Sequence, residues 1–386
     1  MDIILKPRPL RGEITVIPSK SHAHRLLICA AFADQPTCLG CMETNQDIEA
    51  TADCLRALGA EITRTDTGFT VLPVREAPET ATLNCRESGS TLRFLLPFVG
   101  ALGVDATFLL AGRLPQRPLS PLWEEMERMG CTLSRPTDTT IRCQGKLQRG
   151  AYRIDGGVSS QFITGLLFAH SLMDGCTLEI AGKLESKPYV DLTKAAISLF
   201  KGHRSPGSVT VEGDWSNGAF WLAANALGSK LSVHGLNEAS LQGDRAVVEI
   251  LQQLEVGAPT VSAADIPDLV PILAVCAAAK QGAVFTDIRR LRLKESDRVA
   301  SVIAMIEKLG GKAEADENTL TVHGTGLTGG TVDSVNDHRI AMASAIAATV
   351  CTAPVTILGA EAVQKSYPAF WEEYIRLGGN YELYLR

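Results

Sequence analysis

An amphipathic helical pattern that recurs six times restricts the possible fold more than any other feature of this chain. Apolar residues recur in it at helical spacing, and most copies end at a glycine of the kind that closes a helix in the left-handed conformation. A short strand-like segment follows each copy. The copies run from Asp47 to Gly59, Ser120 to Gly130, Asp191 onward, Asp244 to Gly257, Asp297 to Gly310 and Pro368 to Gly378.

A second set of helical segments alternates with the first. Each begins with small, polar or charged residues and continues as a run rich in Ala and Leu that is apolar on nearly all sides, which is typical of a buried helix. These segments begin near Ser19, Ser88, Val158, Asp214, Asp268 and Asp337. Two helices and several strands in each of six units predict an α/β fold built by repetition.

Two of the six units are shorter than the others. Each is cut just after its amphipathic helix, one at Phe200 and Lys201 and the other at Val256 and Gly257. A strand pair is either deleted at these places or absent from the sequence as given, and the sequence leaves both readings open.

Length and charge limit the classes of protein that this chain can belong to. With 386 residues it exceeds one ordinary core, so that two domains are expected. The net charge of −6 argues against a nucleic-acid partner, which needs a basic face. No apolar run is long enough for a membrane span, and no secretory leader is recognisable, so that we expect a cytoplasmic protein.

Metal binding is not expected from the sequence. The ten cysteines are scattered, and only Cys38 and Cys41 form a CxxC pair, with no second pair to complete a zinc site. His22 and His24 flank one residue, but helix capping or a phosphate contact suits them better than a metal. We therefore expect neither a metal nor a cofactor.

Several of the buried helices begin with turns that are rich in hydrogen-bond donors and in basic residues. The first turn of a helix carries unpaired N–H groups and a partial positive charge, which together attract phosphate or carboxylate. Ordinary capping explains any one such turn, but a series of turns that each carry Lys or Arg favours an anionic substrate. The donor-rich turns lie at 19–25, 87–93, 157–161 and 336–339, and all of them except 157–161 carry Lys or Arg. Arg117, Lys294, Arg298 and Lys365 add further positive charge.

The same segments resemble the signatures of the 3-phosphoshikimate 1-carboxyvinyltransferase family. Six motifs match in the family's order over nearly the whole chain: Pro18-Ser-Lys-Ser-His-Ala-His-Arg25, Gly157-Val-Ser-Ser-Gln161, Ser186-Lys-Pro-Tyr189, Leu293-Lys-Glu-Ser-Asp-Arg298, Asn336-Asp-His-Arg339 and Gln364-Lys-Ser-Tyr-Pro368. One such motif alone is weak, whereas six in order are specific.

The resemblance implies two similar domains, each with three βαβαββ units around buried parallel helices, and an active site in the cleft between them. The chain is expected to cross twice between the domains. By analogy, residues 20–227 form an inserted domain that binds shikimate 3-phosphate, and residues 1–19 with 228–386 form the domain that holds both chain ends.

The resemblance also implies a role for each matched residue. Lys20 is expected between the anionic groups of both substrates. Shikimate 3-phosphate is expected to contact Ser21, Arg25, Ser159, Ser160, Gln161, Ser186 and Tyr189. Phosphoenolpyruvate is expected to contact Gly89, Arg117, Arg298, Arg339 and Lys365. Asp268 and Lys294 are also expected to bind substrate.

The implied reaction adds the 5-hydroxyl of shikimate 3-phosphate across the enol double bond of phosphoenolpyruvate and then eliminates phosphate. Asp268 resembles the carboxylate that takes the hydroxyl proton, and Glu295 resembles the group that handles the methylene proton. Two carboxylates assisted by Lys20 and Lys365 can perform these transfers without a metal.

Two positions depart from the family pattern, and other functions stay open. Glu87 stands where the family often has Asn, and Arg290 where an Asn often contacts the acceptor. One alternative is the related transferase that acts on UDP-N-acetylglucosamine, although the segment from Gly112 to Arg117 lacks the Cys of its mobile loop. Another is a non-catalytic anion-binding protein on the same scaffold. We expect a monomer with small-molecule substrates and no nucleic-acid or membrane partner.

Overall fold

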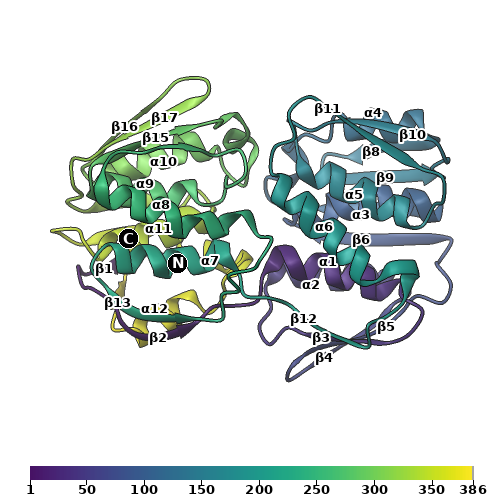
Figure 1. Cartoon of the computed structure of the whole chain (residues 1–386), viewed down its shortest axis with the longest axis horizontal. Helices are drawn as coiled ribbons and strands as arrows, with labels where there is room; N and C mark the ends of the chain where they lie inside the picture. Colours follow the sequence, from purple (N-terminus) through teal and green to yellow (C-terminus); the bar gives the residue numbers. More distant parts are fainter. Residues whose placement is uncertain (385–386) are drawn as a thin grey trace. The chain divides into compact units, whose positions relative to one another are not determined.

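The computed structural model describes residues 1–384 and divides the chain into two compact units. One unit contains Met1–Ile17 and the chain from Gly213 onward, and the other is Pro18–Glu212 (Figure 1). The sequence places residues 213–227 in the inserted domain, whereas the structure assigns them to the unit that holds both chain ends. The reason is that the helix α7 (Trp215–Ala226) buries Phe220 and Trp221 in the core of that unit.

Six inner helices form the cores of the two units, as the apolar runs predict. In the unit Pro18–Glu212 they are α1 (Lys20–Ala31), α3 (Gly89–Leu102) and α5 (Ser160–Ser171). In the other unit they are α7, α9 (Val270–Ala279) and α11 (His338–Ala348). The side chains of Ser19, Ser88, Ser159, Asp214 and Asp337 each accept a backbone N–H of the first turn, which is the capping that Ser and Asp favour.

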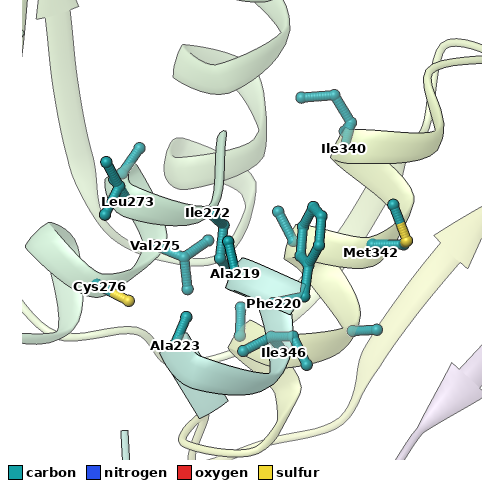
Figure 2. Packing of buried hydrophobic residues seen from close by; sticks show 14 of the residues in the cluster. Ala219, Phe220, Ala223, Ile272, Leu273, Val275, Cys276, Ile340, Met342 and Ile346 are labelled. Atoms are coloured by element: carbon teal, nitrogen blue, oxygen red, sulfur yellow. The ribbon is translucent and has the colours of Figure 1, made fainter. Parts of the chain in front are cut away.

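The three inner helices α7, α9 and α11 pack against one another in the core of this unit. Figure 2 shows Phe220 of α7, Ile272 of α9 and Ile346 of α11 turned toward a common centre. All three side chains are fully buried. Burying surface of this kind at about 25 cal/mol per Å² is the main favourable contribution to folding.

Six outer, amphipathic helices complete the alternation. They are α2 (Gln46–Ala57), α4 (Leu122–Arg128), α6 (Lys187–Leu199), α8 (Val247–Val256), α10 (Arg298–Lys308) and α12 (Phe370–Arg376). Helix α6 begins four residues earlier than the Asp191 predicted from the pattern, because Pro188 in its first turn is compatible with a helix start.

The glycines that follow the outer helices adopt the predicted left-handed backbone in four of the units. Gly59, Gly130, Gly310 and Gly378 all have positive φ. Gly257 is an exception, since its φ of −179° is extended, and the chain runs straight on from α8 toward the next strand.

Each unit contains three sheets. In Pro18–Glu212 the strand orders are β12-β3-β5-β4, β6-β7-β9-β8 and β10-β11. In the other unit they are β14-β15-β17-β16, β18-β19-β1-β20 and β13-β2. The strands of Pro18–Glu212 are Ser208–Thr210 (β12), Thr37–Gly40 (β3), Gly68–Leu72 (β5), Glu61–Thr65 (β4), Thr80–Arg86 (β6), Asp105–Leu110 (β7), Thr140–Gly145 (β9), Cys131–Thr137 (β8), Ala151–Asp155 (β10) and Thr177–Ala181 (β11). The strands of the unit that holds both chain ends are Thr260–Ser262 (β14), Gly282–Thr286 (β15), Thr319–His323 (β17), Lys312–Ala315 (β16), Gly330–Asp333 (β18), Val355–Leu358 (β19), Ile3–Leu5 (β1), Tyr381–Leu383 (β20), Lys230–His234 (β13) and Arg11–Thr15 (β2).

The segment β6-α3-β7-α4-β8-β9 is one complete βαβαββ repeat. Strands β6 and β7 are parallel, and β9 and β8 continue the sheet in antiparallel fashion. The sheets β10-β11 and β13-β2 contain only the parallel pair, and within residues 1–384 no antiparallel pair follows α6 or α8 in them. This agrees with the two shortened units in the sequence.

No helix in the described part of the chain is both long and apolar enough to span a bilayer. Five further short 3-10 helices connect the main elements, and three of them carry or adjoin residues of the candidate site: η1 (Leu114–Gln116), η4 (Arg289–Leu293) and η5 (Ala360–Lys365).

Candidate active site

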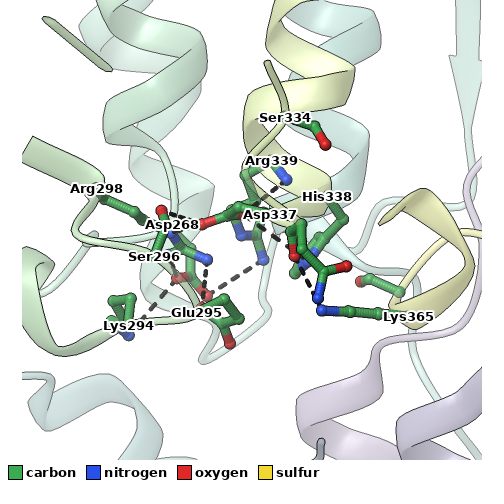
Figure 3. A network of polar contacts seen from close by, with 12 residues as sticks. Asp268, Lys294, Glu295, Ser296, Arg298, Ser334, Asp337, His338, Arg339 and Lys365 are labelled. Atoms are coloured by element: carbon green, nitrogen blue, oxygen red, sulfur yellow. Dashed lines mark hydrogen bonds and ion pairs between the residues drawn. The ribbon is translucent and has the colours of Figure 1, made fainter. Parts of the chain in front are cut away.

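Asp268 lies at the centre of an ion-pair cluster in the unit that holds both chain ends (Figure 3). One carboxylate oxygen is 2.6 Å from Arg298 Nη1 and 3.6 Å from Lys294 Nζ, and the other is 3.2 Å from Arg339 Nη2. Asp268 stands two residues before α9 and does not cap it, because Leu269 occupies the capping position. Its carboxylate is therefore available for the cations.

Arg298, the first residue of α10, joins three carboxylates although its side chain is only 1% exposed. Besides Asp268, its Nη2 donates to Glu295 at 2.7 Å and its Nε donates to Asp337 at 2.9 Å. A cation at a helix N-terminus opposes the helix dipole, so that this position must be stabilised by the surrounding carboxylates. Breaking such a buried network leaves uncompensated charge, which costs about 3–5 kcal/mol.

Asp337 links this network to the start of α11. Its Oδ1 accepts the backbone N–H of Arg339 at 2.9 Å, while Oδ2 accepts Ser296 Oγ at 3.0 Å as well as Arg298. The Arg339 side chain, 3% exposed, also donates to the carbonyl of Ser216. Asp337, which caps α11, thus holds both Arg298 and Arg339 in place, and both arginines are predicted substrate contacts.

The charges of this cluster shift the pKa values of its members. Burial raises the pKa of Asp268, but Arg339, Lys294 and Arg298 outweigh it and hold that pKa well below its usual value. Burial lowers the pKa of Lys294 to about 8, with Asp268 opposing the shift and the neighbouring cations Arg298 and Arg290 adding to it. A carboxylate held ionised beside a lysine whose pKa is lowered to about 8 is an arrangement suited to proton transfer.

Lys365 ends η5 and is buried, with its Nζ donating to the carbonyl of Asn336 at 2.9 Å. That bond fixes the lysine beside the turn that starts α11, as Figure 3 shows. Six predicted residues of this unit, Asp268, Lys294, Glu295, Arg298, Arg339 and Lys365, therefore lie in one neighbourhood around the starts of α9, α10 and α11.

The sequence did not single out a second buried carboxylate in this unit. Asp244 is fully buried and accepts a hydrogen bond from Ser216 Oγ. Burial, and after it the charge of Asp268, raises the pKa of Asp244 to about 7. From the sequence Asp244 is read only as the start of an amphipathic helix, although in the structure it lies in the 3-10 turn η3 (Gly243–Ala246) just before α8.

In the unit Pro18–Glu212 the predicted residues also gather at the starts of inner helices. Lys20, the first residue of α1, forms an ion pair with Asp47 of α2 at 2.9 Å, and both side chains are largely buried. Ser21 follows at a partly buried position of the same turn. Asp47 is a partner that the sequence reasoning missed.

Arg25, one turn further along α1, is directed toward protein acceptors. Its three nitrogens donate to Thr193 at 2.8 Å, to the carbonyl of Ser21 at 2.6 Å and to the carbonyl of Tyr189 at 2.9 Å. Burial lowers its pKa to about 9. The structure therefore shows Arg25 tying Ser21 to the first turn of α6, next to Tyr189.

Gly89 starts α3 and allows two guanidinium groups to approach the helix end. A Cβ added to it would lie 2.6 Å from Nη1 of both Arg117 and Arg93. Arg93 lies in the donor-rich turn at 87–93, and the sequence assigns it no role. It donates to Gln161 at 3.0 Å, and Gln161 donates to Ser90 at 3.0 Å, so that the starts of α3 and α5 are joined.

The three predicted serines of this unit lie at the starts of α5 and α6. Ser159 caps α5, Ser160 is its buried first residue, and Ser186 precedes α6. Ser186 has the left-handed backbone angles φ 55° and ψ 39°, which are uncommon outside glycine and tend to persist where surrounding structure or function requires them.

The two positions that depart from the family pattern have definite surroundings. The Glu87 carboxylate lies against Gly112, where a Cβ would collide with it, at the head of the loop that leads to Arg117. Arg290 lies in η4, and its positive charge contributes to lowering the pKa of Lys294.

No group of three or more His, Cys, Asp or Glu side chains within residues 1–384 is arranged to hold a metal ion. His22 Nδ1 accepts the backbone N–H of Glu212 at 3.2 Å, and His24 is buried with Nδ1 2.7 Å from Thr51 Oγ1. Both rings therefore serve local structure.

Fold and site together define a class: a protein of repeated βαβαββ units that gathers Lys, Arg and carboxylates at the starts of its inner helices to act on small anions. A family model described as EPSP synthase (3-phosphoshikimate 1-carboxyvinyltransferase) matches residues 4–374. The chain belongs to this family, and thereby to a family of transferases.

Similar proteins support the assignment over the full length. A 3-phosphoshikimate 1-carboxyvinyltransferase of Clostridium kluyveri is 38% identical, with 98% of this chain and 97% of that protein covered. One from Clostridium botulinum is 36% identical at 97% coverage of both. A solved EPSP synthase structure from Acinetobacter baumannii shares the fold with a TM-score of 0.78 at 22% identity, covering 99% of each chain. The alignment with the C. kluyveri protein extends over 421 positions, more than this chain contains, so that the relative has residues with no counterpart here.

Proposed function

We propose that this chain transfers the carboxyvinyl group of phosphoenolpyruvate to the 5-hydroxyl of shikimate 3-phosphate and releases phosphate. Membership of the family supports the reaction. The observation that carries the residue assignment is the position of Asp268, which contacts Arg298 and Arg339 and lies near Lys294. A base, a proton donor and cations for an anionic substrate are thereby present in one cluster.

In the addition step, the oxygen of the 5-hydroxyl forms a bond to carbon 2 of phosphoenolpyruvate while carbon 3 receives a proton. We assign removal of the hydroxyl proton to Asp268 and delivery of the proton to carbon 3 to Glu295, with Lys20 and Lys365 assisting. Arg298 and Arg339 neutralise the carboxylate and phosphate groups, since guanidinium pairs with both in bidentate geometry.

In the elimination step, the new methyl group loses a proton and the bond between carbon 2 and the phosphate oxygen breaks. The double bond is thereby restored in the product, and phosphate leaves with that oxygen. Cations that stabilise the leaving phosphate lower the barrier because they are already oriented in a buried site. Gly89, Arg117 and Lys294 complete the proposed phosphoenolpyruvate contacts.

For the acceptor, we propose contacts with Ser21, Ser159, Ser160, Gln161, Ser186 and Tyr189. The helix starts at which most of these residues lie supply backbone N–H groups for a phosphate. Because the nitrogens of Arg25 donate to protein acceptors, we propose that it holds Ser21 and Tyr189 in place.

We further propose a monomer in a reducing compartment, the cytoplasm. Each unit has its own buried core, and all ten cysteines are free, which is usual where thiols are kept reduced. Light scattering coupled to size-exclusion chromatography measures the oligomeric state, and a dimer mass would contradict the first part of this proposal.

The function is tested by measuring phosphate release from phosphoenolpyruvate in the presence of shikimate 3-phosphate, of UDP-N-acetylglucosamine, or of neither, with no metal added. We expect release only with shikimate 3-phosphate. Release only with the nucleotide sugar would show that the proposed acceptor is wrong. Release with neither acceptor would contradict the catalytic proposal.

A further inference from the structure

The unit Pro18–Glu212 contains a hollow of about 660 Å³ that is separate from every predicted site residue. Its walls come from the C-terminal halves of α1, α5 and α6 and from the 3-10 turn η2 (Lys201–His203). The predicted substrate contacts on these three helices lie in or just before their N-terminal halves, toward the opposite end.

The missing strand pair in the repeat that contains α5 explains why a hollow lies beside the end of this helix. In three other repeats, a residue just beyond the antiparallel strand pair donates its N–H to a carbonyl near the end of the inner helix. Val74 donates to Ala31 of α1 at 2.8 Å, Leu147 to Gly100 of α3 at 2.9 Å and Gly326 to Ala278 of α9 at 2.9 Å. Helix α5 belongs to the repeat without a strand pair, and the hollow lies beside its end.

The inner wall of the hollow is apolar and partly aromatic. Phe32, Leu167 and Ile197 line it and are partly exposed, whereas Ile28, Phe98 and Phe168 also line it and are each 1% exposed. Phe32 and Phe98 meet edge to face with ring centres 4.6 Å apart. A flat apolar group suits such a wall, because aromatic rings gain from edge or offset contacts in addition to burial.

The rim of the hollow is predominantly cationic. Lys194 and Lys201 line it and are exposed, and Asp174 is the acidic residue among the lining side chains. His170 also lines it, and its Nε2 is buried without a hydrogen-bond partner in the described part of the chain. A ligand with one carboxylate would satisfy both features.

We propose that this hollow binds a small aromatic carboxylate. The apolar wall takes the ring, Lys194 and Lys201 attract the carboxylate, and the volume falls within the usual range of about 300–1,000 Å³ for small-molecule sites. This proposal does not depend on the proposed function, because binding is measured without either substrate.

The test is isothermal titration of the full chain with 2-naphthoate, and with 2-naphthylmethylammonium as a cation with the same ring system. We expect 2-naphthoate to bind with a Kd below about 1 mM, which corresponds to about 4 kcal/mol, and the cation to bind more weakly. Ser198 is an exposed lining residue of α6, and Ser198→Trp should fill the hollow and abolish binding while the fold is kept.

A charge-reversed variant, Lys194→Glu with Lys201→Glu, should weaken 2-naphthoate binding by about fivefold or more, as the loss of two exposed ion pairs implies. Lys230→Glu, an exposed lysine in the other unit, is the matched control and should leave binding unchanged. Absence of 2-naphthoate binding would overturn the proposal. So would binding that both Ser198→Trp and the double reversal leave intact, because the ligand would then occupy another site.

Discussion

Three cations surround Asp268 and lower its pKa, which weakens it as a proton acceptor. Burial raises its pKa, and Arg339, Lys294 and Arg298 together lower it to well below the usual value. A carboxylate in this state is a weak base. An anionic substrate that engages the same cations would share their charge, so that the pKa of Asp268 rises when the base is required.

Replacing Asp268 by Asn should separate catalysis from binding. We expect Asp268→Asn to lower turnover by about 10²- to 10⁴-fold, the range for loss of a general base. Affinity for phosphoenolpyruvate should stay equal or increase, because the change removes negative charge beside three cations. Phosphate release measures the first and calorimetric titration the second. Asp174→Asn, an exposed site in the other unit, is the control, and wild-type turnover in Asp268→Asn would contradict the assigned role.

Asp244 predicts a pH dependence of stability. Its folded-state pKa is raised to about 7, from an ordinary value near 4, by burial and by Asp268. Below pH 4 the group is protonated in both the folded and the unfolded states. As the pH rises from about 4 to 7, the unfolded state loses its proton first, and the contribution of this group to stability falls.

Asp244→Asn removes that dependence and keeps an oxygen that accepts from Ser216. The free energy of unfolding of the variant minus that of the wild type should therefore be larger at pH 8 than at pH 5. Urea unfolding at both pH values measures this difference. A stability difference that is the same at the two pH values would show that Asp244 does not titrate in this range.

Among single residues, sequence motifs could indicate which residues lie near one another, but they gave no signal for contacts between residues far apart in the chain. Glu295 and Arg298 belong to one short motif, and the structure brings them together. Asp244 contacts Ser216 across 28 residues, and Arg93 contacts Gln161 across 68, so that neither pairing has a local signal.

Among the elements, α3 and α5 pack together with Gly165 against Pro97. Pro97 within α3 has no N–H to donate to the Arg93 carbonyl, and Gly165 of α5 fits against that carbonyl and the Pro97 ring. A Cβ at Gly165 would overlap the carbonyl oxygen. Because Arg93 and Gln161 are carried by these helices, this contact also sets the spacing of site residues.

Gly165→Ala should therefore destabilise the fold by about 1–3 kcal/mol, as overpacking of a core does, although Ala favours helices more than Gly. Urea unfolding measures the change. Gly257→Ala is the control, since nothing lies within 4 Å of a Cβ there and the backbone is extended. Equal stability of Gly165→Ala and the wild type would mean that the two helices separate without cost.

Helix positions could be predicted because apolar periodicity and caps are local. The start of α6 at Lys187 lies four residues before Asp191, because Ser186 and Pro188 also suit a helix start and Asp191 lies inside the helix. The extended Gly257 was likewise hidden, because a glycine after a helix usually indicates a left-handed cap.

In the whole molecule, the chain passes between the units twice, near residue 17 and near residue 213. Within each unit, the residues at the two crossings are hydrogen-bonded to each other. Ser19 donates its N–H to the carbonyl of Glu212 at 2.8 Å, and Asp214 donates to that of Ile17 at 2.9 Å. The resemblance to the family placed the second crossing at 227, after α7. Only the packing of α7 on α9 and α11 places that helix in the unit with both chain ends.

The fragment 18–212 should fold alone, because its core cluster is made of its own residues. We expect a cooperative thermal transition by circular dichroism, and binding of shikimate 3-phosphate without turnover. The matched fragment joins residue 17 to residue 213 through a short glycine linker and should fold but not turn over. A non-cooperative transition of 18–212 would show that the two units are not independent.

The central claim, that a carboxyvinyl group moves from phosphoenolpyruvate to an acceptor, is tested most directly with ¹⁸O in the oxygen that bridges carbon 2 and phosphorus. Mass spectrometry of the phosphate released in the presence of shikimate 3-phosphate identifies the bond that breaks. Addition and elimination cleave the carbon–oxygen bond, so that the account predicts ¹⁸O in the phosphate and the carboxyvinyl ether as the other product. Unlabelled phosphate accompanied by labelled pyruvate would show simple hydrolysis at phosphorus and would contradict the account.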